Sequence, residues 1–172
     1  KGWYLQEMAR YLYPKSKSES NKIQVAAHQK NRFLLKPKTG MIITKVTITS
    51  QKSIGNILNW IRQFDTFEEL SLSLEETLTS LRFMVDADTF EKAFDDLGKA
   101  LGFECQRPDK EWKAGPDNLW ALRDGEYLLV ECKSEAALNR AEVYKHETGQ
   151  MNNSCSWFHD HYPGSKVKRL MI

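Results

Sequence analysis

The 172-residue sequence contains no apolar run that approaches the roughly 18 residues a membrane-spanning helix needs. Its three cysteines, Cys105, Cys132 and Cys155, are odd in number and form no CxxC pair, which argues against a zinc ribbon and a disulfide framework. The sequence also lacks a Walker loop and a GxGxxG motif, so it offers no support for nucleotide binding. These absences predict a soluble protein of a reducing, cytoplasmic compartment.

Acidic residues are scarce in the first third of the chain. Residues 1–60 hold eleven lysines and arginines but only two acids, Glu7 and Glu19. The balance reverses over residues 61–101, which hold four basic and ten acidic residues. A basic first third is typical of a segment that binds a polyanion, and it is equally consistent with a solvated surface.

The first half of the chain reads as a basic N-terminal extension, residues 1–84, with helices and a strand. Residues 41–50 are rich in β-branched side chains and predict a half-buried strand. Ser73 and Glu76 have the spacing of a capping box, which predicts a helix start. The other elements expected here are a helix over residues 3–13, a loop over 14–22 and a helix over 54–64.

The second half, residues 85–172, predicts an α/β core. Its clearest helix carries an apolar stripe over residues 90–101, with Asp88 as the expected N-cap and Gly102 as the terminator. The elements expected next are strands near 103–106, 118–123 and 126–133, a helical region over about 136–162 and a strand over 166–172. The chain begins at Lys1 and ends inside that strand-like run, so we interpret it as a piece of a longer protein.

One charged constellation lies on the two central strands. Pro116-Asp117 is followed by thirteen residues and then by Glu131-Cys132-Lys133. Residues two apart on a strand share a face, so Glu131 and Lys133 emerge side by side, and Asp117 can reach the same end of the sheet. Two carboxylates, with the backbone carbonyl of Cys132, form a hard-oxygen site suited to Mg²⁺ or Mn²⁺. A lysine beside such a site can orient water or neutralise developing phosphate charge.

This pattern, PD…ExK, resembles that of the PD-(D/E)XK nuclease superfamily over about residues 85–172. The resemblance implies a restriction endonuclease-like fold, in which helices flank a mixed central β-sheet. It implies a Mg²⁺- or Mn²⁺-dependent endo- or exodeoxyribonuclease, in which Asp117 and Glu131 hold the metal and Lys133 assists the attacking water. It also implies DNA as partner, and a place within a larger helicase-like or defence protein.

The resemblance extends to two further positions. Many members place a glutamate on the first core helix as an additional metal ligand, and Glu91 matches it; Glu91 could equally be the capping-box partner of Asp88. Some members carry Gln-x-x-x-Tyr on the second helix, where the glutamine supports catalysis; Gln150 matches, but Ser154 replaces the tyrosine. The candidate DNA contacts are Lys36, Lys38, Lys45 and Lys145.

Two alternatives stand beside this hypothesis. Glu131 and Lys133 could form an exposed salt bridge next to an unrelated turn aspartate. The domain could also be a catalytically silent nucleic-acid-binding or scaffolding module of the same fold. Trp120 alternates with Leu119 and Leu122 on its strand, which favours a core position over base stacking.

Overall fold

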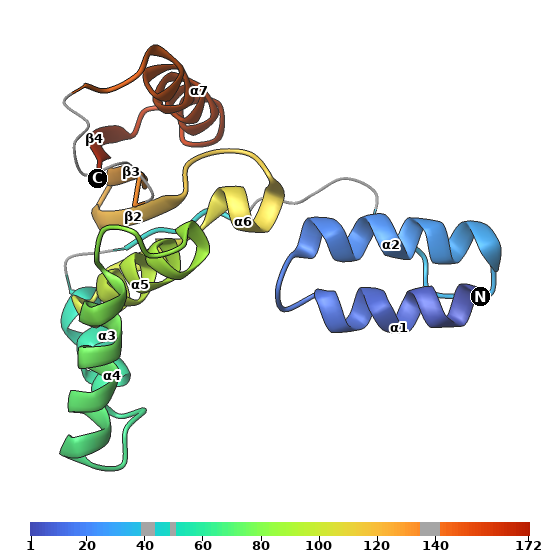
Figure 1. Cartoon of the computed structure of the whole chain (residues 1–172), viewed down its shortest axis with the longest axis horizontal. Coiled ribbons are helices and arrows are strands. Elements are labelled where there is room, and N and C mark those ends of the chain that lie inside the picture. The colour runs from blue at the N-terminus through green and yellow to red at the C-terminus, as the bar shows by residue number, and fades with distance from the viewer. Residues whose placement is uncertain (39–43, 49–50, 135–141) are drawn as a thin grey trace. The chain divides into compact units, whose positions relative to one another are not determined.

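The computed structural model describes residues 1–38, 44–48, 51–134 and 142–172 (Figure 1). The chain divides into two compact units. The first contains Lys1–Thr44 and Pro108–Ala114, and the second contains Lys45–Arg107 and Gly115–Ile172. The boundary predicted between residues 84 and 85 falls within the second unit. In the described part of the chain, no helix has the length and apolar character that crossing a membrane requires.

A helical hairpin, α1 (Gly2–Leu12) and α2 (Lys17–Lys30), forms most of the first unit, together with the short helix α6 (Pro108–Trp112). The helix predicted over residues 3–13 is confirmed. The loop predicted over residues 14–22 is confirmed at residues 14–16 and is wrong from Lys17 onward, where α2 begins. The side chain of Ser16 accepts a hydrogen bond from the N–H of Glu19 and so caps α2. Helix α2 packs on α1 through small residues, and its Ser20 donates a hydrogen bond to the carbonyl of Ala9 at 2.6 Å. The sequence of α2 therefore shows no apolar stripe.

Three helices open the second unit: α3 (Lys52–Ile61), α4 (Phe67–Ser80) and α5 (Ala87–Ala100). The capping box predicted at residues 73–76 is wrong, because α4 begins earlier, where Thr66 accepts from the N–H of Glu69 at 3.2 Å. Asp88 is likewise not the N-cap of α5. Asp86 accepts from the N–H of Thr89 at 3.0 Å and starts that helix two residues sooner. Gly102 follows the helix with a φ of 86°, as expected for a terminating glycine.

A strand was predicted over residues 41–50. Residues 44–48 do not form a strand, so the prediction is wrong there. The other residues of that range, 41–43 and 49–50, are outside the described residues. Two tyrosine hydroxyls take the hydrogen-bonding role of a neighbouring strand. The N–H of Val46 donates to the hydroxyl of Tyr162 at 3.2 Å, and the hydroxyl of Tyr127 donates to the carbonyl of Val46 at 3.0 Å. The β-branched pattern therefore reflects an irregular segment packed on the core, with Ile48 buried.

The sheet has four strands: β1 (Glu104–Gln106), β2 (Asn118–Arg123), β3 (Glu126–Glu131) and β4 (Lys166–Met171). They lie in the order β1-β2-β3-β4, in which β1–β2 and β2–β3 are antiparallel and β3–β4 is parallel. The mixed α/β architecture, the antiparallel central pair and the inclusion of the last strand are confirmed. Helix α7 (Lys145–His161) connects β3 to β4. Of the helical region predicted over residues 136–162, residues 136–141 lie outside the described residues and residues 142–144 are not helical.

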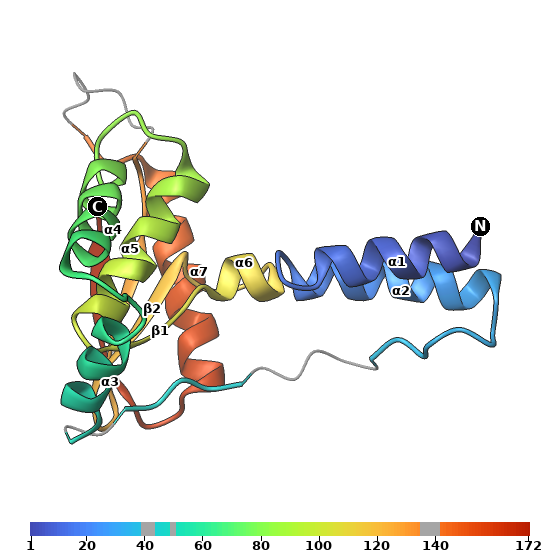
Figure 2. The ribbon, with the colours of Figure 1, turned by 90° about the horizontal axis from the view of Figure 1, so that it is seen from below.

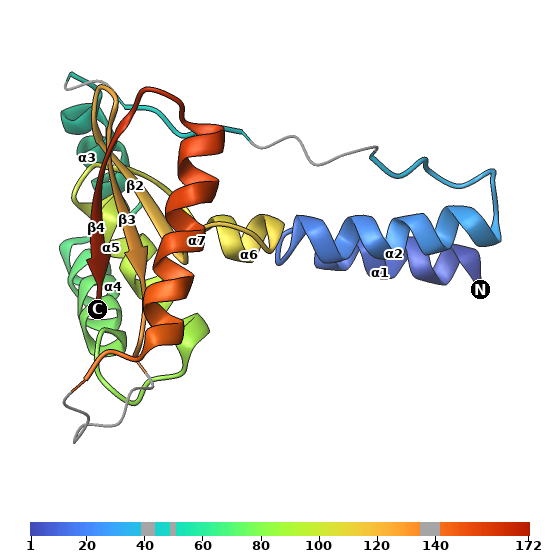
Figure 3. The same ribbon diagram turned by 90° about the horizontal axis from the view of Figure 1, so that it is seen from above.

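The sheet lies between α5 on one face and α7 on the other (Figures 2 and 3). On the α5 face the core contains Phe90, Phe94, Trp120, Val130 and Cys132. The rings of Phe94 and Trp120 stack with centroids 4.5 Å apart, so the core position predicted for Trp120 is confirmed. Because side chains alternate along β3, Glu131 points to the other face, where Ser154 of α7 donates a hydrogen bond to it.

Gly98 on α5 is a point of close approach between helix and sheet. A Cβ at this position would lie 2.5 Å from the Sγ of Cys105 and 2.6 Å from the Trp120 ring. We therefore expect Gly98→Ala to lower the free energy of unfolding by about 1–3 kcal/mol through overpacking, measured by urea denaturation. Gly149→Ala on α7 is the matched control, because open space surrounds it and the substitution should be neutral or stabilising. Equal effects of the two variants would contradict this packing.

Candidate functional site

Asp117 lies immediately before β2, where the chain enters the sheet. It follows Pro116, which is fully buried, and Gly115. Gly115 has a φ of 93°, and a Cβ there would meet the Trp157 ring, so the position has no room for a side chain. The Oδ2 of Asp117 accepts a hydrogen bond from the N–H of Cys132 at 2.7 Å. This bond places the carboxylate against the backbone between Glu131 and Lys133.

Glu131 ends β3 with its side chain pointing toward α7. It is only 4% exposed. Its Oε1 accepts from the hydroxyl of Ser154 at 2.6 Å, and its Oε2 lies 3.6 Å from the Nζ of Lys133. Burial raises the pKa of Glu131, and the charge of Asp117 raises it further, whereas Ser154 and Lys133 act in the opposite direction.

Lys133 bridges the site by two contacts. Its Nζ pairs with Glu131 and also donates to the carbonyl of Cys132 at 3.2 Å. The salt bridge between Glu131 and Lys133 that was considered as an alternative is therefore present. It is not exposed, because Glu131 is buried. Burying a carboxylate costs desolvation free energy even when it is paired. This cost is higher than that of an ion pair on the surface.

Glu91 approaches from α5. Its Oε2 lies 2.6 Å from the Nη2 of Arg107, and the same guanidinium nitrogen is 2.9 Å from the Oδ1 of Asp88. The capping-box interpretation of Glu91 is wrong, because with Asp86 as N-cap the third helical position is Thr89. Burial raises the pKa of Glu91; the hydrogen bond from Arg107 lowers it, and the charge of Asp117 raises it.

Asp117 thus acts on two glutamates at this end of the β2–β3 pair. Its charge raises the pKa of Glu91 and also that of Glu131. The thiol of Cys132 belongs to the same neighbourhood: burial and then the charges of Asp117 and Glu91 raise its pKa to about 12. A thiol with this pKa stays protonated at neutral pH, so Cys132 offers its carbonyl rather than its sulfur.

The donors at this site are hard oxygens, which suit Mg²⁺ or Mn²⁺ better than a soft metal. Over the described ranges, no three His, Cys, Asp or Glu side chains are grouped closely enough to hold a metal ion. Asp117 and Glu131 each supply carboxylate oxygens of the kind that such a cation prefers, and the charge of Asp117 acts on Glu131. The Oε2 of Glu91 is held by Arg107.

Helix α7 contributes a residue whose role the sequence did not indicate. Gln150 is exposed, whereas Ser154, one turn further along, is buried and donates to Glu131. Ser154 occupies the position at which the family pattern has a tyrosine. The four-residue spacing that places it on the same helix face as Gln150 was the available signal.

The four candidate DNA-binding lysines are all exposed. Lys36 and Lys38 belong to the first unit, and Lys45 and Lys145 belong to the second. The Nζ of Lys45 lies 5.6 Å from the centroid of the Tyr162 ring, and Lys145 is the first residue of α7.

No family model, curated protein or solved structure matches this chain.

Ser154 allows the surroundings of Glu131 to be tested separately from its carboxylate. Ser154→Ala removes a hydrogen bond to a charged group, so we expect the free energy of unfolding at pH 7 to fall by about 1.5–3 kcal/mol. It should also raise the pKa of Glu131 further, because the hydrogen bond favours the ionised form. Urea denaturation and NMR titration of the carboxyl group would measure both. Ser156→Ala, at an exposed position of the same helix, is the control and should change neither.

Proposed function

We propose that the second unit is a metal-dependent nuclease domain that hydrolyses DNA phosphodiester bonds. The observation that carries the proposal is the hydrogen bond from Cys132 to Asp117, which brings the aspartate against the segment bearing Glu131 and Lys133. Glu131 is buried and Asp117 and Lys133 are half-buried, which is costly for charged groups, and this chemistry accounts for all three.

The order of elements supports the same proposal. Apart from the short helix α6, which lies between β1 and β2, the chain from α5 onward runs as helix, three strands, helix and strand: α5, β1 to β3, α7 and β4. This is the order of the PD-(D/E)XK superfamily, so we propose that the mixed sheet and its helices form a restriction endonuclease-like core. The motif residues lie at the start of β2 and at the end of β3, which are adjacent because those strands are antiparallel.

Each residue has a distinct proposed role. Asp117 and Glu131 would hold Mg²⁺ or Mn²⁺, with the carbonyl of Cys132 as a further oxygen donor. The bound cation would supply Lewis-acid stabilisation of the phosphoryl oxygens and lower the pKa of water. Lys133 would orient the attacking water and balance the negative charge that develops on the phosphate. Ser154 would keep Glu131 ionised despite its burial.

Cleavage assays with purified protein would test this proposal directly. Single-stranded, duplex, flapped and circular DNA, together with RNA, should be incubated with Mg²⁺ or Mn²⁺ and, in parallel, with EDTA. We expect metal-dependent cleavage of at least one DNA substrate. Cutting of the circular substrate would identify an endonuclease, and cutting of linear DNA alone would identify an exonuclease. Absence of cleavage across the whole panel would contradict the proposal.

A second candidate is a catalytically silent nucleic-acid-binding module of the same fold. The observation that favours it is that each carboxylate already has a protein partner: Arg107 for Glu91, the Cys132 N–H for Asp117, and Ser154 for Glu131. Such a module would bind DNA equally well with and without divalent cation. Isothermal titration calorimetry with Mn²⁺ distinguishes the two candidates, because the nuclease requires a metal-binding event that the module lacks.

A further inference from the structure

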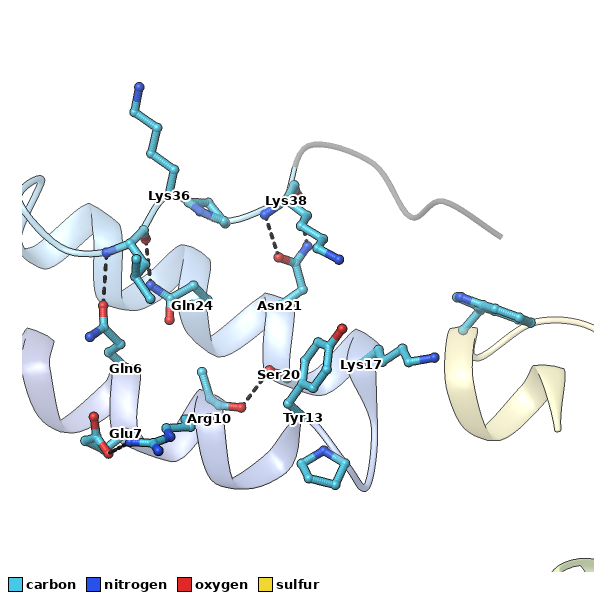
Figure 4. A pocket seen from close by; sticks show the side chains of 15 residues that line it. Gln6, Glu7, Arg10, Tyr13, Lys17, Ser20, Asn21, Gln24, Lys36 and Lys38 are labelled. Carbon is cyan, nitrogen blue, oxygen red and sulfur yellow. Dashed lines mark hydrogen bonds and ion pairs between the residues drawn. The ribbon is translucent and has the colours of Figure 1, made fainter. Parts of the chain in front are cut away.

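The first unit contains a groove with a volume of about 640 Å³. Its walls come from α1, from α2 and from residues 35–38, which run alongside the two helices (Figure 4). Trp112 of α6 also lines it. This volume is within the range of pockets that bind small organic groups, about 300–1,000 Å³.

Side-chain amides fix the non-helical wall of the groove. The Oε1 of Gln6 accepts from the N–H of Leu35 at 3.0 Å, and the Nε2 of Gln24 donates to the carbonyl of Leu35 at 2.6 Å. Asn21 forms two hydrogen bonds with the backbone of Lys38, at 3.0 and 3.1 Å. Figure 4 shows these amides reaching from the helices to the segment. The groove is therefore a preorganised feature of the unit, which lowers the entropic cost of binding.

The groove carries surplus positive charge. Its charged lining residues are one acid, Glu7, and four bases: Arg10, Lys17, Lys36 and Lys38. Arg10 lies 3.9 Å from Glu7, and Lys17 lies 2.9 Å from Glu111. Among the residues that the structure describes, Lys36 and Lys38 form no ion pair, and both are exposed. The ligand that complements this lining is an anion.

The groove also offers a flat apolar surface. The Tyr13 ring is 47% exposed and lines the groove, as do two prolines, Pro14 and Pro37. An aromatic ring beside lysines is the arrangement by which proteins bind single-stranded nucleic acid, because the ring stacks on a base while the cations contact phosphates. Duplex DNA offers phosphates but keeps its base faces inside the stack.

We propose that the first unit binds single-stranded DNA, with one base stacked on Tyr13 and neighbouring phosphates contacting Lys36 and Lys38. The inference deepens the proposed function and rests on it for the choice of DNA as ligand. The inference goes further in two respects: the bound DNA is single-stranded, and it lies in the groove rather than on lysines dispersed over the surface.

Fluorescence anisotropy of the full chain with a labelled oligothymidylate in EDTA tests the inference. We expect Tyr13→Ala to weaken binding about tenfold, within the effect of removing one base-stacking aromatic side chain. Tyr4→Ala, at an exposed tyrosine of α1 outside the groove, is the control and should not change the affinity. Circular dichroism would verify that both variants stay helical.

The lysines have their own test, which remains decisive if Tyr13→Ala fails to fold. The double variant Lys36→Ala and Lys38→Ala should reduce the slope of log K against log salt concentration by about 1.4, because each phosphate contact of a single strand contributes about 0.7. The control removes the same charge from α2 outside the groove, with Lys22→Ala and Lys30→Ala, and should leave the slope nearly unchanged.

Three outcomes would overturn the inference: equal or tighter binding of a duplex of the same length, equal binding of a glutamate-rich peptide, or no binding of oligothymidylate by the wild-type protein. These results are independent of catalysis, because EDTA is present throughout. Oligothymidylate binding without metal-dependent cleavage of any substrate would contradict the nuclease proposal alone. Cleavage combined with an unaffected Tyr13→Ala variant would contradict the groove alone.

Discussion

Replacing Lys133 with alanine is expected to reduce the rate of DNA cleavage by about 100-fold or more, the usual cost of losing one group that stabilises transition-state charge. Binding of DNA and of Mn²⁺ should change little, because the lysine is not one of the proposed metal ligands. Its Nζ contacts the Oε2 of Glu131 and the carbonyl of Cys132, and Glu131 is also held by the hydroxyl of Ser154. Single-turnover cleavage with a calorimetric measurement of Mn²⁺ affinity would separate the two effects.

The surroundings of Lys133 define the conditions of that experiment. Lys133 lowers the pKa of Glu131, so its loss should raise that pKa, and the variant and the wild type should be compared over a series of pH values rather than at one. Lys168→Ala on β4 removes the same charge from an exposed position of the same sheet and should keep full activity. Equal losses in the two variants would mean that only general charge matters, and would contradict a specific role for Lys133.

The sequence was most informative where its patterns depend on backbone periodicity. The alternation in residues 118–133 predicted the β2–β3 pair, and the same alternation predicted that Glu131 and Lys133 would share a face. The apolar stripe of α5 was equally clear, since its residues Phe90, Ala93 and Phe94 are buried. These predictions succeeded because burial of one face imposes its period on the sequence.

The failures arose where stability comes from polar contacts. Helix α2 was missed because its buried face is made of Ser18, Ser20 and Ala27, which carry no apolar signal. Two aspartates two residues apart could each cap α5, and local sequence could not distinguish Asp86 from Asp88. The contact of Ser154 with Glu131 spans 23 residues of sequence, and only the packing of α7 on the sheet creates it.

The site shows the same division between local and long-range information. Spacing alone predicted that Asp117 and Glu131 would approach one another, and the charge of Asp117 does raise the pKa of Glu131. Arg107 lies sixteen residues from Glu91, and no sequence pattern indicated that it would hold that carboxylate. The second result bears directly on function, because the ion pair competes with any metal for the glutamate.

Asp117→Asn is expected to have the largest effect, a loss of cleavage of about 1,000-fold, since it removes a proposed metal ligand and with it several kcal/mol of charge stabilisation. Asparagine is the informative substitution because its side-chain oxygen can still accept the N–H of Cys132. Alanine would instead leave that buried N–H without its acceptor, at a cost of about 1–3 kcal/mol, and would confuse folding with catalysis.

The pH dependence of stability gives Asp117→Asn a second, metal-free readout. Burial raises the pKa of Glu91 and Glu131 above the ordinary value of 4.5 and the charge of Asp117 adds to this rise, so above that pH the folded state binds more protons than the unfolded state. The free energy of unfolding contributed by these two groups therefore falls as pH rises from about 4.5 through their raised pKa values. Removing the aspartate charge should reduce this fall.

Relative to the wild type, Asp117→Asn should thus gain stability between pH 4.5 and neutrality in EDTA, when urea denaturation is compared across that range. The order should reverse with Mn²⁺, because a metal at 100 times its dissociation constant would stabilise the wild type by about 2.7 kcal/mol and the variant by far less. Identical pH profiles for the two proteins would show that Asp117 does not share a site with the glutamates. A gain in EDTA without any effect of Mn²⁺ on the wild type would favour the silent module.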